Sequence, residues 1–385
     1  MYFLVPGRIW SLSLAELHCV LDSHKIRYVR VAADKSVFLF DIQTDTKEIV
    51  RIFSRLGGFV KIGTVINDPY ENIKNRLSSE SKIHFTVSNH KEGKSKALLH
   101  EKKKLGMQIK DYFKEAGLPS RFVTSSIPAI ESNVLIHKQR ILDRGFDLCI
   151  FNHPSLSKTI CGETLAVQDF EGFAARDYKR PKVNVNKGML PPKLARIMVN
   201  LAAIPEVGVV WDPFCGSGTI LMEGIMLGYK VVGTDIDDAS VVESKANLSW
   251  VSETYMISHR QYRVEKHDIK QGIPANTDFD AIVAEPYLGP VRRDILTVRE
   301  LEESIEKITP VYEAIKDLVA SSHMQGKRLV VVVPGFKTPS GWIDMDFFPD
   351  KGTITEELTF KYGNQGLQWI RPDSIIRRNI KIYQF

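Results

Sequence analysis

The residues with the clearest chemical potential surround a glycine loop in the second half of this 385-residue sequence. The loop lies in Val210-Trp-Asp-Pro-Phe-Cys-Gly-Ser-Gly-Thr-Ile220. Gly216 and Gly218 let the backbone approach a ligand closely, and a helix beginning after them offers free N–H groups to a carboxylate or phosphate. Asp212 precedes the loop and suits an electropositive ligand. Asp235 follows the next apolar run and can accept hydrogen bonds from both hydroxyls of a ribose.

Two common nucleotide-binding patterns are excluded at this loop. A dinucleotide fingerprint requires a third glycine at the position of Leu221. A P-loop requires a Gly-Lys-Ser/Thr ending, which this segment lacks. The ligand is therefore not expected to be held through a pyrophosphate.

The run Asp212-Pro-Phe-Cys-Gly-Ser-Gly-Thr219 resembles the cofactor loop of class I S-adenosylmethionine-dependent methyltransferases, in the form found in enzymes that methylate exocyclic amines of bases. The resemblance implies that the loop backbone holds the methionyl part, that Asp235 holds the ribose and that Asp268 contacts the adenine amine. It implies a metal-free S-adenosyl-L-methionine site. Its cofactor-binding residues are Asp212, Phe214, Cys215, Gly216, Ser217, Gly218, Asp235 and Asp268. For Cys215 we expect apolar packing rather than reactivity.

A second segment, Phe279-Asp-Ala-Ile-Val-Ala-Glu-Pro-Tyr-Leu-Gly-Pro290, resembles the Asp/Asn-Pro-Pro-Tyr/Phe tetrad of amine methyltransferases without matching it. With the strand length kept constant, Glu285, Pro286 and Tyr287 take the places of the acid and the two prolines. With the aromatic residues aligned, Ala284 takes the place of the acid. We prefer the first alignment, because its carboxylate can orient the hydrogens of a weakly nucleophilic amine and Tyr287 can stack on a rotated base. The expected catalytic residues are Glu285, Pro286 and Tyr287.

The resemblance extends upstream of the loop. Gln168–Phe173, Arg176–Pro181 and Gly188–Ala202 resemble the strap and first helix of the THUMP-containing tRNA guanine-N2-methyltransferases that act on guanosine 10 in archaea and eukaryotes. Ile83–Ser88 and Ala116–Ser125 are more weakly similar to the RNA-binding THUMP region of that family. The family implies a tRNA partner, and it leaves open an activating protein partner and the oligomeric state.

The elements that must position these residues alternate between strand and helix after residue 192. Strands are expected over 207–211, 230–234, 261–267, 280–284 and 328–334, and helices over 193–203, 219–227, 239–250 and 299–322. Such alternation specifies a mostly parallel sheet with helices on both faces. Residues 353–361 and 378–383 are expected to form a terminal antiparallel hairpin.

The first half is predicted to be α+β. Expected strands cover 2–5, 28–32, 37–41, 82–88, 121–125 and 147–152, and the two expected helices begin at Ser13, as N-cap, and near residue 95. The predicted domains are a ferredoxin-like α+β unit over 1–60, a THUMP-like RNA-binding domain over 61–166, a linker or strap over 167–192 and a methyltransferase domain over 193–385. The fold class is α/β, a Rossmann-like class I methyltransferase preceded by that RNA-binding module.

Positive charge is concentrated in the first half of the chain. Residues 1–160 carry a net charge of +9, whereas residues 161–385 carry −3. A basic cluster indicates contact with a polyanion, although a solvated helix face is the plainer interpretation. The expected RNA-binding residues are Lys91, Lys94, Lys96, Lys102, Lys103, Lys104, Lys110 and Arg121.

Composition limits the remaining classes. Hydrophobic residues make up 43% and charged residues 25%, as in ordinary globular proteins, and no apolar run approaches the length of a membrane span. The N-terminus lacks the basic start of a signal peptide, so we expect a cytoplasmic protein without membrane contact. The four cysteines form no Cys-x-x-Cys pair, which argues against disulfides and structural zinc.

The leading hypothesis is an S-adenosylmethionine-dependent tRNA guanine-N2-methyltransferase of the guanosine-10 type. One alternative is an adenine-N6 or cytosine-N4 methyltransferase on DNA or RNA. Another is a non-catalytic RNA-binding protein with a degenerate methyltransferase domain, which the missing second proline favours.

Overall fold

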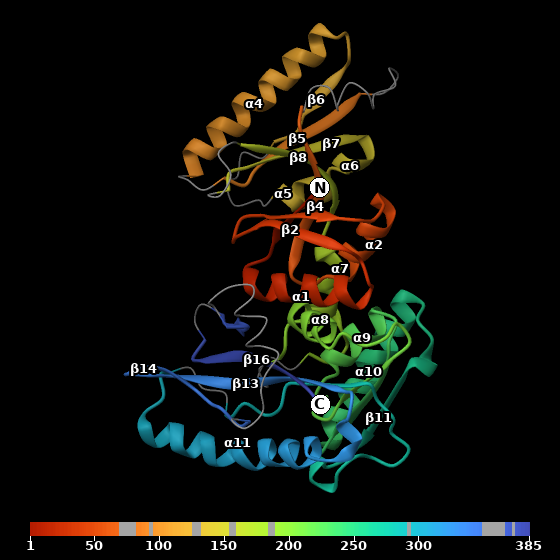
Figure 1. The fold of residues 1–385 in the computed structure, drawn as a ribbon, viewed down its shortest axis with the longest axis vertical. Coiled ribbons are helices and arrows are strands. Elements are labelled where there is room, and N and C mark those ends of the chain that lie inside the picture. The colour runs from red at the N-terminus through yellow and green to blue at the C-terminus, as the bar shows by residue number, and fades with distance from the viewer. Residues whose placement is uncertain are drawn as a thin grey trace. The chain divides into compact units, whose positions relative to one another are not determined.

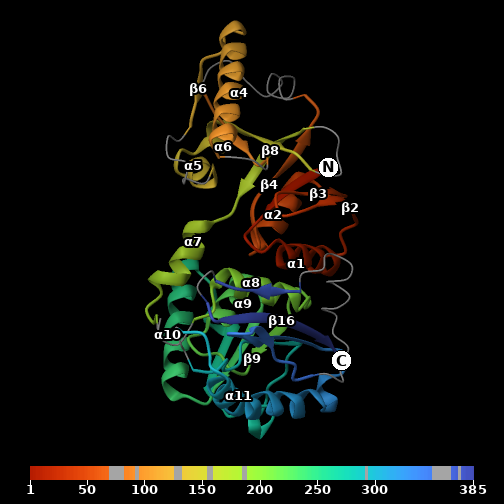
Figure 2. The same ribbon diagram turned by 90° about the vertical axis from the view of Figure 1, so that its left-hand side faces the viewer.

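The chain divides into two units in the computed structural model, which describes residues 1–68, 82–91, 95–124, 132–153, 159–183, 189–290, 294–348, 366–371 and 374–385. The first unit comprises residues 1–10, 25–54 and 59–169, and the second comprises 11–24, 55–58 and 170–385. Figures 1 and 2 show their helices and strands. Residues 11–24 belong to the second unit, although they precede most of the first unit in the sequence.

The first unit is built on one mixed sheet with the strand order β2-β3-β1-β4-β8-β7-β5-β6. Its strands are β1 (Tyr2–Pro6), β2 (Tyr28–Ala33), β3 (Phe38–Ile42), β4 (Phe59–Ile66), β5 (Ile83–Asn89), β6 (Ser120–Phe122), β7 (Gly145–Phe151) and β8 (Ile160–Val167). Its helices are α2 (Thr46–Arg55, whose last residue falls in the second unit), α4 (Ser95–Glu115), α5 (Ser132–Lys138) and α6 (Ile141–Arg144). Strand β5 pairs in parallel with β6 and β7, and the other strand pairs of this sheet are antiparallel.

Helix α4 packs on this sheet through an apolar stripe. Ile109 and Phe113 are buried against Phe85 and its neighbours on β5 and β7. A side chain at Gly106 would come within 2.2 Å of the Phe122 ring, so this glycine permits the close approach of α4 to β6. The stripe leaves the opposite face of the helix for exposed side chains, including Lys96, Lys103 and Lys110.

The second unit contains another mixed sheet, with the order β11-β10-β9-β12-β13-β16-β15 and β14 paired to β13. Its strands are β9 (Val209–Asp212), β10 (Lys230–Asp235), β11 (Tyr262–Lys266), β12 (Ala281–Ala284), β13 (Arg328–Thr338), β14 (Gly341–Asp344), β15 (Gln368–Trp369) and β16 (Ile376–Gln384). Its helices are α1 (Trp10–Ser23), α7 (Phe170–Ala174), the π-helix η1 (Ala175–Lys179), α8 (Pro192–Leu201), α9 (Thr219–Met226), α10 (Asp238–Tyr255) and α11 (Val298–Val319), with 3-10 turns η3 (His259–Gln261), η4 (Ile269–Gln271) and η5 (Ser322–Met324).

The order of the strands places a topological switch between β9 and β12. Strands β11, β10, β9, β12 and β13 are parallel, and the connection reverses direction across the sheet after β11. Ligands of open α/β sheets bind outside the carboxyl ends of the strands at such a point. The ends of β9 and β12 are where the sequence places Asp212 and Glu285.

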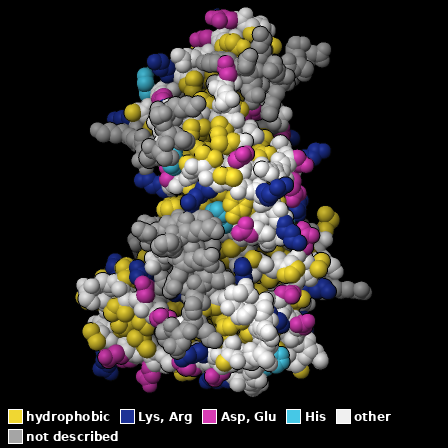
Figure 3. Space-filling model, viewed as in Figure 1, with side chains coloured by type: hydrophobic (Ala, Val, Ile, Leu, Met, Phe, Trp, Pro, Cys, Tyr) yellow, Lys and Arg dark blue, Asp and Glu magenta, His cyan; other side chains and the backbone are white. Residues whose placement is uncertain are grey.

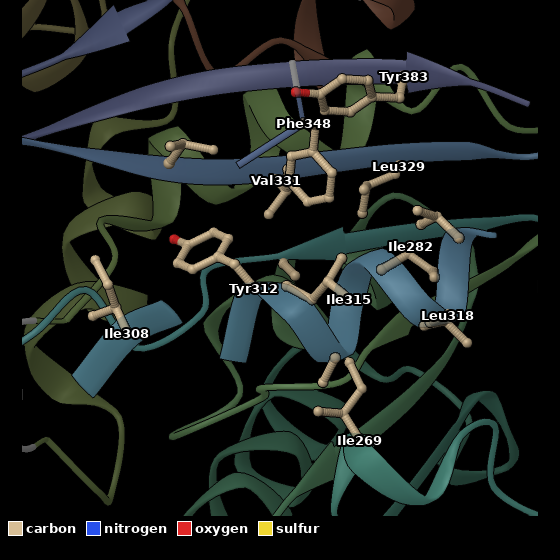
Figure 4. Packing of buried hydrophobic residues seen from close by; sticks show 14 of the residues in the cluster. Ile269, Ile282, Ile308, Tyr312, Ile315, Leu318, Leu329, Val331, Phe348 and Tyr383 are labelled. Carbon is tan, nitrogen blue, oxygen red and sulfur yellow. The ribbon is translucent and has the colours of Figure 1, made fainter. Parts of the chain in front are cut away.

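Helices cover both faces of this sheet, α11 on one side and α8 and α9 on the other (Figures 1 and 2). On the α11 side, Tyr312 and Ile315 meet β12 and β13 in a cluster that includes Ile282 and Val331 (Figure 4). The buried Tyr312 hydroxyl donates to Val332 O at 2.8 Å, so the polar atom of this core residue has a partner.

The α/β alternation predicted after residue 192 is confirmed, with each expected strand and helix present within a few residues at its ends. The terminal strand is present as β16, which pairs antiparallel with β13 and β15. The expected partner strand over 353–361 lies outside the described residues. The pairing of β14 with β13 was not anticipated.

Several features of the first 192 residues differ from the sequence predictions, and no element was expected at β4, β8, α5 or α6. Helix α1 begins at Trp10, so Ser13 is not an N-cap; its Oγ lies inside the helix and donates to Gly58 O at 2.6 Å. Helix α2 was missed, because only one helix was expected in the first 60 residues. The strap contains α7 and η1 rather than irregular backbone alone. The domain boundaries remain predictions, and β4 runs across the expected division between residues 60 and 61.

Candidate functional site

The glycine loop connects β9 to α9 as the sequence predicts. Gly216 and Gly218 both have positive φ angles, 49° and 82°. A Cβ on Gly216 would meet only Phe214 O, at 4.0 Å, so the backbone there is open to an approaching group. A Cβ on Gly218 would lie 2.6 Å from Ser244 Oγ, so this glycine is required for packing against α10. The two glycines therefore have different physical roles.

The loop is held in place by side chains from α10 and the strap. Asn247 Nδ2 donates to Ser217 O at 2.8 Å and to Lys182 O at 3.0 Å. Arg180 Nη1 donates to Thr219 Oγ1, the first residue of α9, at 2.7 Å. These contacts fix the end of α9 that faces the loop, and the sequence alone did not single out Asn247 or Arg180.

Behind the loop, Glu223 on α9 lies between two buried guanidinium groups. Its Oε1 accepts from Arg176 Nε and its Oε2 from Arg196 Nε, both at 2.6 Å. Both guanidiniums also stack on the Phe173 ring. A buried carboxylate is tolerated there because both of its oxygens have charged donors.

The acids predicted to hold the cofactor all lie at strand ends and accept backbone hydrogen bonds. Asp235 Oδ2 accepts from Gly216 N at 2.8 Å, and its Oδ1 accepts from Asp237 N at 3.0 Å. Asp268 Oδ1 accepts from Lys270 N at 3.0 Å at the start of η4. Each carboxylate oxygen has two lone pairs, so it can accept more than one hydrogen bond.

Asp212 is buried at the end of β9, and its Oδ1 accepts from Phe214 N at 3.0 Å. Burial raises the pKa of Asp212 well above its usual range, and the nearby charges of Asp235 and Glu285 add to the increase. A cationic group beside this carboxyl would oppose that shift. Burial likewise raises the pKa of the Cys215 thiol well above its usual value, which keeps it protonated and fits the packing role expected for it.

One cavity of about 770 Å³ in the second unit brings the predicted residues together. Its walls include every predicted cofactor-binding and catalytic residue except Gly218: Asp212, Phe214, Cys215, Gly216, Ser217, Asp235, Asp268, Glu285, Pro286 and Tyr287. Ile236 and Ile269 add apolar surface beside Asp235 and Asp268. Cavities of this size accommodate a nucleoside-sized ligand.

Glu285 directly follows β12, and its side chain forms an ion pair with Arg378 of β16. The side chains are 14% and 10% exposed. Tyr287 is half exposed at the cavity wall. Ala284, the alternative position for the acid, is fully buried within β12.

The C-terminal strands contribute site residues that the sequence reasoning missed. Arg371 and Arg378 line the cavity, and their guanidiniums lie over the Trp369 ring at 5.5 and 5.1 Å from its centroid. The available signal was the pair Arg377-Arg378 in a strand, because consecutive strand residues point to opposite faces. Arg377 pairs with Asp344 on one face, and Arg378 reaches the cavity on the other.

The expected RNA-binding residues lie in the first unit but not on one surface. Lys96, Lys103, Lys104, Lys110 and Arg121 are exposed. Lys91 is paired with Glu101 at 2.6 Å, and Lys102 lies on the buried side of α4, where burial lowers its pKa. Lys94 lies outside the described residues. On the face in Figure 3, basic and acidic side chains are interspersed.

Metal and membrane features were searched within the described part of the chain. No group of three or more His, Cys, Asp and Glu residues is arranged to hold a metal ion there. None of the helices in that part combines the length and apolar character required to cross a membrane.

The strand order, the glycine loop and the acids at the strand ends define a class I methyltransferase domain in the second unit. In agreement, residues 179–303 match the family UPF0020, the RMKL-like methyltransferase domain. The methyl donor of class I methyltransferases is S-adenosyl-L-methionine. The site fits that molecule, because an open backbone at Gly216, carboxylates at Asp212 and Asp235 and apolar walls line one cavity.

More particularly, the chain is similar to tRNA (guanine(10)-N2)-dimethyltransferases. It is 32% identical to that of Methanothermobacter thermautotrophicus over 184 residues, 48% of this chain and 49% of the relative. It is 38% identical to that of Methanocaldococcus jannaschii over 136 residues, 34% of this chain and 36% of the relative. The chain thus spans about half or less of the length of these curated relatives.

A solved structure shares the fold along the whole chain. TrmN from Thermus thermophilus gives a TM-score of 0.51 at 15% identity, covering 100% of this chain and 99% of that chain. At this level of identity, the similarity concerns the fold alone.

Proposed function

We propose that this chain transfers a methyl group from S-adenosyl-L-methionine to the exocyclic N2 of guanine in tRNA, at guanosine 10. The observation that carries the proposal is the position of Glu285 at the carboxyl end of β12, in the same cavity as the glycine loop and Asp235. The names of the archaeal relatives supply the substrate and the position.

The cofactor is proposed to lie along the carboxyl ends of β9, β10 and β11. Asp235 would accept the ribose hydroxyls, and the backbone at Gly216 and Ser217 would hold the methionyl part. Asp212 would face the positively charged groups of the ligand, and Asp268 the adenine amine. Ile236 and Ile269 provide apolar surface for the adenine ring.

Glu285 is proposed as the acceptor that orients the target amine. When bound, the cofactor supplies an electrophilic methyl group: the amine nitrogen bonds to that carbon as the carbon–sulfur bond breaks onto sulfur, and the nitrogen then loses one proton. The Glu285 carboxylate accepts the hydrogen bond of the amine and then that proton, which stabilises the positive charge that develops on nitrogen. Ala284 carries no polar group, which favours the alignment that uses Glu285. Tyr287 would stack on the base, and Pro286 would fix the backbone between them.

The first unit is proposed to be the RNA-binding module, ferredoxin-like and THUMP-like in its two parts. Support comes from the net charge of +9 over residues 1–160 and from the lysines on the exposed face of α4. RNA backbones are bound through positively charged side chains.

The decisive experiment is transfer of tritiated methyl groups from S-adenosyl-L-methionine to bulk tRNA and to DNA, followed by nucleoside analysis. We expect label in N2-methylated guanosine from tRNA. Glu285→Ala should slow the reaction by about a hundredfold to a thousandfold with cofactor affinity nearly unchanged. Glu303→Ala, which removes an exposed carboxylate on α11, is the matched control and should keep the wild-type rate.

Two other results would contradict the proposal. Label in adenine or cytosine would favour the alternative, an adenine-N6 or cytosine-N4 methyltransferase. Binding of cofactor and tRNA without transfer to any nucleic acid would favour the non-catalytic protein.

A further inference from the structure

We infer that Glu285 and Arg378 act as one unit that reads the Watson–Crick edge of guanine, so that Arg378 is a specificity-determining residue. This inference rests on the proposed function, because it concerns the base whose amine is methylated. It assigns a role to a residue near the C-terminus that neither the glycine loop nor the Glu-Pro-Tyr segment contains.

The sheet register brings the two side chains together from distant parts of the sequence. Ala284 on β12 is opposite Val331 on β13, and Pro334, three residues further along β13, is opposite Arg378 on β16. Glu285 follows Ala284 directly, so it lies just past the end of β12, about two residues along β13 from the level at which Arg378 is paired. Their ion pair is formed by Arg378 Nε and Glu285 Oε1.

Arg378 is held in place by the pairing of its strand and by an aromatic ring. Strand β16 is hydrogen-bonded between β13 and β15, and the Arg378 guanidinium lies 5.1 Å from the centroid of the Trp369 ring. Both members of the pair line the cavity that contains the cofactor-binding residues. A guanidinium fixed by a carboxylate and an aromatic face has little rotamer freedom left to lose when a ligand binds.

The chemistry of the pair has a direction. A guanidinium can only donate hydrogen bonds, and it carries five N–H groups, of which the contact with Glu285 uses Nε–H. A carboxylate can only accept. Across the pair, a base would therefore meet a donor from Arg378 followed by two acceptors from Glu285.

Guanine is the base whose Watson–Crick edge complements that order. Its O6 accepts, and its N1–H and N2–H donate, so O6 would face Arg378 while N1–H and N2–H would face the two oxygens of Glu285. Adenine presents an acceptor at N1 and cytosine at N3, and either lone pair would point at a carboxylate oxygen. Buried polar groups left unpaired or opposed are the strongest basis for rejecting a near-isosteric substrate.

The test uses two tRNA transcripts that differ only at position 10, one with guanosine and one with 2-aminopurine. The analogue keeps the N2 amine but lacks O6 and carries a lone pair at N1. We expect the wild-type chain to methylate guanosine at least about a hundredfold faster. The glutamine of Glu285→Gln presents an oxygen to N2–H and an N–H to N1. This variant should methylate the guanosine transcript more slowly than the wild type does. Its ratio of rates on guanosine and 2-aminopurine should be at least tenfold smaller than that of the wild type. Fluorescence of the analogue measures its binding independently of turnover, and the Glu285→Gln chain should bind the analogue transcript more tightly than the wild type does.

Arg378→Met tests the donor. It should slow methylation of guanosine by about tenfold to a hundredfold while changing the 2-aminopurine rate much less, because only guanine has O6. Arg378→Lys should restore part of the guanosine rate. Arg377→Met is the matched control, because this neighbour pairs with Asp344 on the opposite face. Its preference between the two transcripts should equal that of the wild type.

The outcomes separate the inference from the proposed function. Equal wild-type rates on the two transcripts, or an Arg378→Met chain that slows both equally, would overturn the reading of the edge while leaving guanine methylation in place. A wild-type chain that transfers no methyl group to the guanosine transcript would overturn the proposed function, and with it the inference.

Discussion

At the scale of single residues, the candidate site is organised by where each carboxylate finds its hydrogen-bond donors. Asp235 accepts from the backbone of the glycine loop, Asp212 from its own turn and Glu285 from an arginine two strands away. The first two arrangements follow from local sequence, because strand ends and glycine turns are local. The third depends on the register of β16, which no local pattern specifies.

Asp235→Ala is expected to weaken binding of the cofactor by about tenfold to a hundredfold, because it removes a charged acceptor worth about 1.5 to 3 kcal/mol. Calorimetric titration with S-adenosyl-L-homocysteine measures this change. Asp235→Asn keeps one acceptor for Gly216 N, so its affinity for the cofactor should lie between those of the wild type and Asp235→Ala. Asp238→Ala, which removes an exposed carboxylate paired with Lys266, should bind as the wild type does. Equal affinities for all four chains would exclude the ribose-binding role.

The raised pKa of Asp212 predicts that binding of the cationic methyl donor releases a proton. In the free site the carboxyl is protonated below its raised pKa, and a positive charge beside it favours ionisation. Affinity should therefore increase with pH below that pKa, by up to about tenfold per pH unit. Calorimetry over a series of pH values, in two buffers of different ionisation enthalpy, should detect the released proton. Asp212→Asn should show none, and an unchanged proton count in this variant would contradict the assignment.

Most residues that the sequence proposed for the site line one cavity in the structure, but the sequence did not indicate their hydrogen-bond partners. Motif spacing identified the loop, Asp235 and Glu285, because each occurs where a strand ends. Arg378 and Asn247 act across the fold, so their roles depend on the pairing of β16 and the packing of α10. The same distinction explains Lys102, which belongs to the basic cluster in sequence yet turns toward the core on a helix of 3.6 residues per turn.

At the scale of elements, regular alternation allowed the strands and helices after residue 192 to be predicted. The exceptions are elements whose register is set by tertiary contacts. Helix α1 starts three residues before the predicted cap, because Ser13 and Glu16 are used inside the second unit to satisfy the backbone of residues 57 and 58. Tertiary bonding thus overrode a local capping signal.

Glu16 makes the stability of the packing between α1 and residues 57 and 58 depend on pH. Its carboxylate accepts from Gly57 N, Gly58 N and Asn200 Nδ2, at 2.7 to 2.8 Å, yet burial raises its pKa to about 7. When the pKa of a carboxyl is higher in the folded state than in the unfolded state, the folded protein loses stability as pH rises between the two pKa values. For Glu16 these are near 4.5 in the unfolded state and about 7 in the folded state. The loss corresponds to about 3 kcal/mol.

Urea unfolding of wild type and Glu16→Gln at about pH 5 and pH 7.5 measures this effect. The difference between the two chains cancels titration of other groups. At the higher pH, we expect the unfolding free energy of Glu16→Gln to increase relative to that of the wild type. Glu302→Gln on α11 is an exposed control, and its difference from the wild type in unfolding free energy should be the same at both pH values. If the difference between Glu16→Gln and the wild type is the same at both pH values, the Glu16 carboxyl does not titrate in this range.

At the scale of the whole molecule, the two units divide the chemistry that the proposed function requires. The second unit contains the cavity, the glycine loop and the acids, and residues 161–385 carry a net charge of −3. The first unit contains the exposed lysines of α4. Because residues 11–24 and 55–58 belong to the second unit, a fragment over residues 1–160 would remove α1 from its packing. RNA binding is therefore best tested in the full chain.

The exposed face of α4 is expected to supply the salt-dependent part of tRNA binding. Lys96, Lys103 and Lys110 recur every seven residues and so share one face of the helix. The triple substitution of these lysines by glutamine should weaken tRNA binding at least about tenfold at 0.1 M salt, and should reduce the slope of log affinity against log salt by about 2 to 3. The rate of methyl transfer at saturating tRNA should stay near that of the wild type, because none of these residues lines the cavity.

A control chain with Lys47, Lys230 and Lys245 changed to glutamine loses the same charge from other exposed positions. If both triple variants lower the salt slope equally, binding responds to net charge alone and α4 is not the RNA-binding surface.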